Sequence, residues 1–294
     1  MSLKHSGVTN TPTKPAQKRA KNVKIDIVTT DVDGTLLSSD QKLTDRTVKA
    51  IELAHQAGVQ VILATGKAPG PWLAKTLPKL PGKTPKVYQQ GLLMYDEDDK
   101  EIYRGDLDQQ LCREIVAFAA HQNVTLSGYS TDRVFCIKTN EQTDRLIFYG
   151  EPTPESMGPW DPVISQYPIQ KFLLMDSLER IDEIRPQVQQ QFGDRIHLTV
   201  AIKGMLEILP MGASKGAGVA RMLKNIGASA DGLMALGDGE NDVQMFELAA
   251  LGVAMGNAVP ELLAVADECV SSNDDEGVAE AIERFVLAPR GIKF

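Results

Sequence analysis

Short apolar runs alternate with amphipathic helical stretches at both ends of this sequence, and this alternation restricts the fold more than any other feature. An apolar run ending at Val28 precedes a helical stripe that stops at Gly58, and a second apolar run follows at 59–63. From residue 214 the alternation returns, with helices expected at 215–225, 241–250 and 259–266 and strands at 232–236, 253–254 and 269–270. Strand and helix in turn are typical of a parallel sheet with right-handed crossovers. We therefore expect an α/β fold with a Rossmann-like parallel-sheet core.

The middle of the sequence has a different composition. A helical stretch at 111–121 precedes two strand-like runs that meet at Ser130-Thr131-Asp132, as in a hairpin. Prolines and glycines crowd residues 150–162, which we expect to form a loop, and further strands are expected at 171–175 and 195–202. The simplest organisation is a core built from residues 24–94 and 200–294, with an α+β domain inserted at 95–199.

Composition excludes several classes of protein. The net charge of −8 argues against a dedicated nucleic-acid binder, which is normally basic. No apolar run approaches the ~18 residues of a membrane span. The three cysteines have no CxxC spacing, which favours a reducing compartment over a disulfide framework or a zinc site. Residues 1–23 are basic and rich in proline and small polar residues, as in a disordered leader. A cytoplasmic location is the expectation, with organelle targeting by this leader as the alternative.

Clusters of polar residues follow the expected core strands. The carboxyl ends of parallel strands lie at one edge of an open sheet, so residues that are distant in sequence can meet there. The clusters are Asp31-Val32-Asp33-Gly34-Thr35, Thr65-Gly66-Lys67, Gly212-Ala213-Ser214-Lys215-Gly216 and Gly237-Asp238-Gly239-Glu240-Asn241-Asp242. Their repetition at successive strand ends indicates one polar site.

The first cluster suggests a divalent cation. Asp31 and Asp33 are two positions apart, so in an extended segment both carboxylates face the same side. Carboxylates so close repel each other unless a cation lies between them, and Mg²⁺ prefers oxygen ligands. Taken alone, such a pair is also found in simple turns and in nucleotide-sugar transferases, and the fourth cluster alone is an acidic turn that caps a helix.

The second and third clusters suggest a bound phosphoryl group. Thr65, Gly66 and Lys67 offer a hydroxyl, a backbone amide and a positive charge. Lys215 lies near the start of a helix, where a cation is not favoured, so its position invites a ligand. Taken alone, a solvated lysine is the simpler interpretation. Together these groups can hold a phosphoryl group through hydrogen bonds and charge.

The four clusters together resemble the motifs of the haloacid dehalogenase-like superfamily, specifically its Cof-type phosphatases with a C2-type (IIB) cap domain. The resemblance extends over about 270 residues and is carried by DVDGTLL at 31–37, GDGEND at 237–242 and VAMGNA at 253–258. Only 34 positions separate Asp31 from Thr65, which leaves no room for a cap. The roughly 150 residues between Thr65 and Lys215 do leave room.

The resemblance implies a role for each residue. Asp31 would be the nucleophile that forms an aspartyl-phosphate, and Asp33 the general acid and then the general base. Phosphate binding would fall to Thr65, Gly66, Lys215 and Asn241. Mg²⁺ would be held by the Asp31 side chain, the Asp33 main-chain carbonyl and Asp238, with Asp242 supporting it through water. The implied activity is Mg²⁺-dependent hydrolysis of small phosphomonoesters, such as sugar, nucleotide or cofactor phosphates, by a monomer or homodimer.

Two other functions and a remote third remain open at this point. A phosphosugar mutase of the same superfamily would reorient a bisphosphate, and a weakly catalytic phosphometabolite-binding protein would not need both carboxylates of the first cluster. A glycosyltransferase would leave Lys215 and the GDGEND run unexplained. The chain also departs from the family pattern, with Lys67 in place of the usual arginine and Gln90-Gly91 in place of Asn-Gly. Lysine lacks the planar fork of arginine, so we expect altered geometry where the substrate binds.

Specificity is expected to come from the inserted domain. Its candidate substrate-facing residues are polar or aromatic, although each is more simply an ordinary surface or strand residue: Tyr129, Arg133, Lys138, Lys171, Arg195 and His197.

Overall fold

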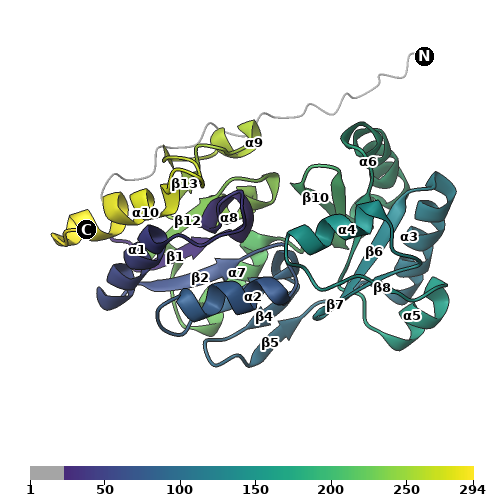
Figure 1. Ribbon diagram of the computed structural model, residues 1–294, viewed down its shortest axis with the longest axis horizontal. Helices are drawn as coiled ribbons and strands as arrows, with labels where there is room; N and C mark the ends of the chain where they lie inside the picture. The colour runs from purple at the N-terminus through teal and green to yellow at the C-terminus, as the bar shows by residue number, and fades with distance from the viewer. Residues whose placement is uncertain (1–22) are drawn as a thin grey trace, which may run out of the picture.

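The computed structural model describes residues 23–294, in which two β-sheets lie side by side (Figure 1). An eight-stranded sheet has the order β14-β13-β12-β1-β2-β3-β4-β5, and a six-stranded sheet has the order β10-β11-β9-β6-β7-β8. Apart from Val23, the predicted leader lies outside the described residues. The α/β fold class is confirmed.

The eight-stranded sheet is parallel from β14 to β3, and β4 and β5 continue it as an antiparallel hairpin. Its strands are β1 (Ile27–Thr30), β2 (Gln60–Ala64), β3 (Lys86–Tyr88), β4 (Leu93–Tyr95), β5 (Glu101–Arg104), β12 (Leu233–Gly237), β13 (Leu251–Ala254) and β14 (Glu268–Cys269). One face is covered by α1 (Asp45–Gln56), α2 (Pro71–Thr76) and α10 (Gly277–Ile282), and the other by α7 (Lys215–Asn225), α8 (Val243–Leu248) and α9 (Pro260–Leu263).

Strand periodicity explains the two covered faces. Val61 and Leu63 of β2 pack into the core formed with α1, whereas Ile62 and Ala64 pack with α7 and α8. Successive side chains of a strand point to opposite faces, so a central strand that is apolar throughout needs a helical layer on each side. Because helices cover both faces of the sheet, the polar residues that follow the strands lie together at the edge formed by the strand ends.

The six-stranded sheet belongs to the inserted domain. Its strands are β6 (Thr125–Ser130), β7 (Arg133–Cys136), β8 (Glu155–Ser156), β9 (Lys171–Met175), β10 (Ile196–Ile202) and β11 (Met205–Pro210). The outer face packs against α3 (Gln109–Gln122), α5 (Trp160–Gln166) and α6 (Leu178–Phe192) (Figure 1). Helix α4 (Glu141–Phe148) packs on the inner face through Leu146. Alternate strand residues, including Tyr129, Lys171 and Glu207, belong to this inner face, which lies toward the polar edge of the larger sheet.

The predicted boundaries of the inserted domain require correction. The expected span of 95–199 cuts into the β4–β5 hairpin, which belongs to the eight-stranded sheet, and leaves out β11, which belongs to the six-stranded sheet. Strand β11 escaped prediction because Glu207 interrupts its apolar run. The expected loop at 150–162 is also wrong in part, because it contains β8 and the start of α5. The inserted segment lies between β5 and α7.

No helix in the described part of the chain is long and apolar enough to cross a lipid bilayer.

Candidate active site

Asp31 lies directly after β1, and its side-chain contacts to described residues all involve one of its two carboxylate oxygens. Its Oδ1 accepts a hydrogen bond from the Val32 amide at 2.6 Å and lies 2.7 Å from Nζ of Lys215. Within residues 23–294 no donor contacts Oδ2. The side chain is 6% exposed and lines a cavity between the two domains. One carboxylate oxygen is therefore anchored while the other stays available to a ligand.

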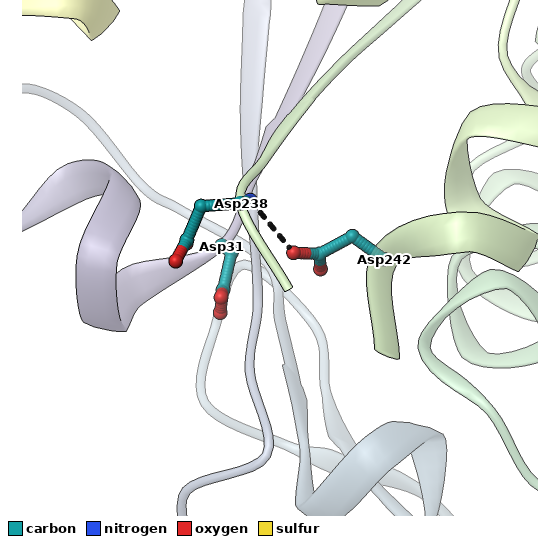
Figure 2. A group of neighbouring side chains, drawn as sticks. All are labelled: Asp31, Asp238 and Asp242. Atoms are coloured by element: carbon teal, nitrogen blue, oxygen red, sulfur yellow. Dashed lines mark hydrogen bonds between the residues drawn. The ribbon is translucent and has the colours of Figure 1, made fainter. Parts of the chain in front are cut away.

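Three carboxylates converge beside this cavity (Figure 2). Candidate ligand oxygens of Asp31, Asp238 and Asp242 all lie within 4.8 Å of one another. Burial and then the charge of Asp242 raise the pKa of Asp238 to about 7. Burial also raises the pKa of Asp31 well above its usual range, although Lys215 opposes this shift. Crowded buried carboxylates resist ionisation, and a divalent cation relieves this. The donor set therefore fits Mg²⁺.

Gly34 permits the close approach of the first and fourth clusters. Its φ is +71°, and a Cβ there would lie 2.3 Å from Oδ2 of Asp238. Only glycine combines this backbone conformation with this free space. Thr35, the next residue, donates a hydrogen bond from Oγ1 to Oδ1 of Asp238 at 2.6 Å. The turn after β1 thus fixes the carboxylate that follows β12.

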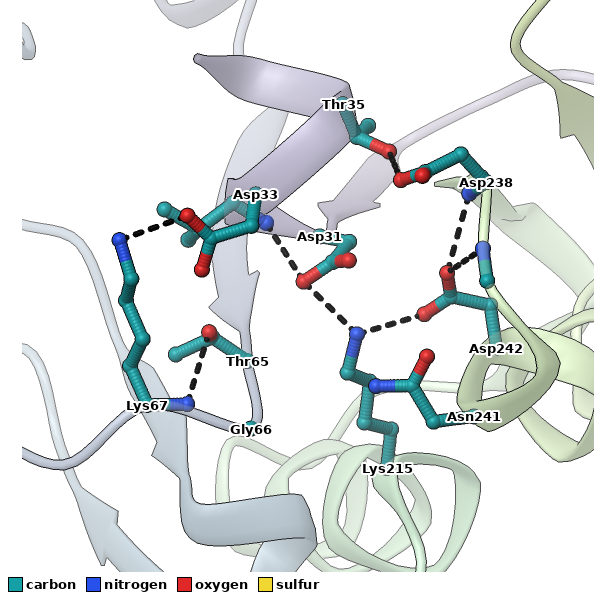
Figure 3. Close-up of polar contacts among 12 residues, drawn as sticks. Asp31, Asp33, Thr35, Thr65, Gly66, Lys67, Lys215, Asp238, Asn241 and Asp242 are labelled. Atoms are coloured by element: carbon teal, nitrogen blue, oxygen red, sulfur yellow. Dashed lines mark hydrogen bonds and ion pairs between the residues drawn. The ribbon is translucent and has the colours of Figure 1, made fainter. Parts of the chain in front are cut away.

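Lys215 does not line the cavity, and its ammonium lies between Asp31 and Asp242 (Figure 3). Its buried ammonium is 2.7 Å from Oδ1 of Asp31 and 2.8 Å from Oδ1 of Asp242. Burial alone would lower the pKa of Lys215, but the two carboxylates raise it above its usual range. Asp242 also accepts the amides of Asp238 and Gly239, each at 3.0 Å. Lys215 and Asp242 therefore act as the internal support of the cluster.

The loop after β2 brings a cation to Asp33. Nζ of Lys67 is 2.7 Å from Oδ1 of Asp33, an ion pair without hydrogen-bond geometry, and it donates to Oε1 of Gln41 at 3.0 Å. It also lies 5.3 Å from the ring centre of Trp72. Thr65 turns the loop by accepting the Lys67 amide at 3.1 Å. The lysine that departs from the family pattern is thus the partner of the predicted acid–base group.

A buried chain of hydrogen bonds joins the two domains and ends at Asn241. Lys171 donates to the carbonyl of Gly66 and to Oε2 of Glu207, both at 2.7 Å. Gln90 donates to Oε1 of Glu207 at 2.9 Å, and Asn241 donates to Oε1 of Gln90 at 3.2 Å. We call Lys171, Glu207, Gln90 and Asn241 the interdomain chain. Through it the inserted domain contacts the second and fourth clusters.

The structure brings most of the predicted site residues to one cavity. Asp31, Asp33, Thr65, Gly66, Asp238 and Asn241 line it, and Lys215 and Asp242 support it from behind. Its volume of about 40 Å³ is far below the ~300–1,000 Å³ of typical ligand pockets. In this closed arrangement the two domains leave no room for an organic phosphate.

The six candidates in the inserted domain divide into two groups. Tyr129 and Lys171 line the cavity. The others lie elsewhere: Arg133 pairs with Glu155, Arg195 pairs with Glu114, and Lys138 and His197 line separate surface hollows. The sequence analysis missed Glu151 and Glu207, which also line the cavity. An acidic residue within an otherwise apolar run, as in Met205-Leu206-Glu207-Ile208, is the signal that would have found the second of them.

Comparisons with known proteins show which family this chain resembles. Residues 28–282 match the model of the haloacid dehalogenase-like hydrolase family. A Streptococcus pyogenes serotype M6 protein named as a candidate phosphatase is 32% identical over 276 residues, covering 90% of this chain and 99% of its own. The chloroplastic endoribonuclease YBEY of Arabidopsis thaliana is 40% identical over 267 residues, and this chain spans 87% of itself but only 46% of that relative.

A solved structure gives the same fold. A haloacid dehalogenase-like hydrolase from B. subtilis superposes with a TM-score of 0.81 at 20% identity, covering 89% of this chain and 100% of the other. The family match extends from β1 to α10 and so includes all four polar clusters. This chain belongs to the haloacid dehalogenase-like hydrolases.

Proposed function

We propose that this protein is a Mg²⁺-dependent phosphatase that hydrolyses small phosphomonoesters through an aspartyl-phosphate on Asp31. The observation that carries the proposal is the anchored carboxylate of Asp31, with its free oxygen at a cavity shared with Asp33 and Asp238. Similarity to a protein named as a candidate phosphatase supports the same reaction class. The endoribonuclease name of the longer relative is not carried over, because this chain spans less than half of that protein.

The arrangement supports a two-step reaction. Oδ2 of Asp31 attacks phosphorus, the bond from phosphorus to the leaving oxygen breaks, and Asp33 gives its proton to that oxygen. Asp33 then takes a proton from a water molecule that attacks phosphorus, the bond from phosphorus to Asp31 breaks, and inorganic phosphate is released. Thr65, the Gly66 amide and Asn241 surround the phosphoryl oxygens. Lys215 holds the other oxygen of Asp31, so the nucleophile does not need to reorganise.

Asp31, Asp238 and the Asp33 main-chain carbonyl would hold Mg²⁺, and Asp242 would support it from behind. Bound Mg²⁺ supplies positive charge that lets an anionic carboxylate approach an anionic phosphate. We propose that the inserted domain is the cap and that it moves away from the core to admit substrate. The cytoplasm remains the proposed location.

A phosphate-release screen over sugar, nucleotide and cofactor phosphates tests this function. We expect release from at least one class, only with Mg²⁺ present. Chromatography of the same reactions distinguishes the phosphosugar mutase, because a mutase returns an isomerised phosphate ester and little free phosphate. If the protein bound these compounds but formed neither free phosphate nor an isomerised ester, the proposed phosphatase activity would be wrong.

Mg²⁺ should raise the melting temperature as well as support turnover. A cation that binds the folded state alone stabilises it by mass action, about 2.7 kcal/mol at a hundred times its dissociation constant. Asp238→Asn should weaken this stabilisation, because it removes one of the converging carboxylates. Thermal unfolding with and without Mg²⁺ measures the effect, and Asp231→Asn on the exposed loop before β12 is the control. Equal Mg²⁺ shifts in wild type and Asp238→Asn would place the cation elsewhere.

Lys67→Met should lower turnover without abolishing binding of inorganic phosphate. Lys67 orients the Asp33 carboxylate, and general acid–base catalysis contributes roughly 10²–10⁴-fold, so a misplaced Asp33 should cost at least ~10-fold. Lys75→Met, an exposed change on α2, is the matched control. Steady-state rates and product inhibition by phosphate measure the two effects. Turnover equal to that of the control would show that Asp33 does not need the ion pair.

A further inference from the structure

Glu151 is a buried carboxylate in the cavity that the proposed chemistry does not use. It follows α4 in the inserted domain, is 7% exposed, and lines the same cavity as Asp31. Two backbone contacts join its loop to the core: the Ala68 amide donates to Oε2 of Glu151 at 3.0 Å, and the Trp72 amide donates to the carbonyl of Gly150 at 3.1 Å. The carboxylate is therefore held at the domain boundary beside the second polar cluster.

Each carboxylate oxygen of Glu151 has one hydrogen-bond partner and can accept another. Besides the Ala68 amide, its recorded partner is the hydroxyl of Tyr129 at 3.4 Å, a long hydrogen bond. In the described part of the chain no ion pair involves Glu151, because the nearby ammonium groups of Lys171 and Lys67 are paired with Glu207 and Asp33. Burial raises the pKa of Glu151 to about 7, against the opposing effect of both lysines. A carboxylate offers about four acceptor sites, so acceptor capacity remains.

The cavity position of Glu151 indicates which part of a substrate it meets. A phosphoryl group is anionic and would be repelled, so the partner belongs to the leaving alcohol. Glu151 is also close enough to Asp33 for their charges to interact, and Asp33 is the group that protonates the leaving oxygen. Leu173 and Met205 line the same cavity and can cover a carbon skeleton. A hydrogen-bond donor on the leaving group, near the ester oxygen, can therefore bind to a free acceptor position of the Glu151 carboxylate.

We propose that Glu151 determines specificity by accepting a hydrogen bond from a hydroxyl of the leaving alcohol, which selects phosphate esters of polyols and sugars. The inference rests on the proposed phosphatase function. A hydroxyl fits better than an ammonium, because an ammonium at Glu151 would also meet the positive charges of Lys67 and Lys171. The partner is one hydroxyl close to the ester, so the effect does not depend on the rest of the molecule.

Matched pairs of esters test the inference. The ratio of kcat/KM for glycerol 3-phosphate over 3-hydroxypropyl phosphate, and for 2-hydroxypropyl phosphate over n-propyl phosphate, should exceed one in at least one pair, because the members of each pair differ only in the hydroxyl next to the ester carbon. A hydrogen bond to a charged group corresponds to roughly 10- to 100-fold. Glu151→Gln, which keeps the shape and one acceptor oxygen, should reduce the ratio, and Glu151→Leu should bring it close to one. Glu141→Gln, an exposed change on α4, should leave it unchanged.

The outcomes separate this inference from the function on which it rests. If Glu151 were only structural, its variants would slow both esters of a pair by the same factor, and the unchanged ratio would overturn the inference. A preference for phosphoethanolamine that disappears in Glu151→Leu would overturn the assignment of a hydroxyl. A wild-type protein that hydrolyses p-nitrophenyl phosphate with no preference within either pair refutes the inference alone. A wild-type protein that hydrolyses none of these esters refutes the proposed function and the inference with it.

Discussion

Replacing Asp31 by asparagine should lower turnover of every phosphomonoester by at least ~10³-fold. The amide keeps the shape of the side chain but is a poor nucleophile. Because the nucleophile acts in the chemical step, the loss should appear in kcat rather than in substrate binding. Phosphate release under saturating substrate and Mg²⁺ measures it. Asp40→Asn, on the exposed loop before α1, provides a control with the same chemical change.

A second variant separates the covalent route from direct attack by water. With Asp33→Asn, the phosphoryl group should persist on Asp31, because the group that activates the attacking water in the second step is gone. Mass spectrometry of acid-quenched enzyme should then find one added phosphoryl group, and the Asp31→Asn protein should carry none. Full activity of Asp31→Asn, or full activity of the wild type in excess chelator, would refute the mechanism.

Lys215→Met should destabilise the protein by about 3–5 kcal/mol, because removal of one partner from a buried ion pair leaves charge uncompensated. Asp31 and Asp242 would both lose the ammonium that lies within 2.8 Å. Activity should fall as well, since the anchored oxygen of Asp31 loses its support. Urea unfolding measures the stability, and Lys224→Met, an exposed change on the same helix, should alter it by less than ~0.5 kcal/mol.

The pH dependence of this loss has a definite sign. The pKa of Asp31 is already raised by burial, and the charge of Lys215 opposes that shift, so the variant should raise the pKa further. A carboxyl whose folded-state pKa exceeds its unfolded value destabilises the fold increasingly as pH rises through the folded-state value. The deficit of Lys215→Met relative to wild type should therefore be greater at pH 8 than at pH 5. A deficit that shrinks with rising pH would contradict the role given to Lys215.

The convergence of the polar clusters could be predicted from the sequence, because each cluster is recognised from its immediate neighbours in the chain. Asp31 follows an apolar strand directly, and Lys215 starts a helix capped by Ser214. Parallel strands then bring such positions to one edge, whatever the length of chain between them. The α/β fold could be predicted from the alternation of apolar strands and amphipathic helices along the chain. The apolar strands form the sheet, and the helices form the layer on each of its faces.

The contacts between the domains could not be predicted in this way. The burial of Glu207 is compensated by the ammonium of Lys171, 36 positions earlier in the chain, and the sequence around either residue does not predict the other as its partner. Glu151 lies in a segment whose prolines and glycines predicted only a loop. Gln90 and Lys67 were noted as departures from the family pattern, but their partners, Glu207 and Asp33, became visible only in three dimensions.

The Lys171–Glu207 ion pair also bears on how fast the domains can separate. Both residues belong to the six-stranded sheet, so the pair travels with the inserted domain and is not broken when the domains part. At this contact, separation of the domains breaks the hydrogen bonds to Gly66 and Gln90 but not the ion pair, and water can replace both hydrogen bonds. Because a typical hydrogen bond contributes a net ~0.5–1.5 kcal/mol, the barrier from this contact is small. The preformed pair therefore gives the observed arrangement two hydrogen bonds between the domains and adds little resistance to their separation.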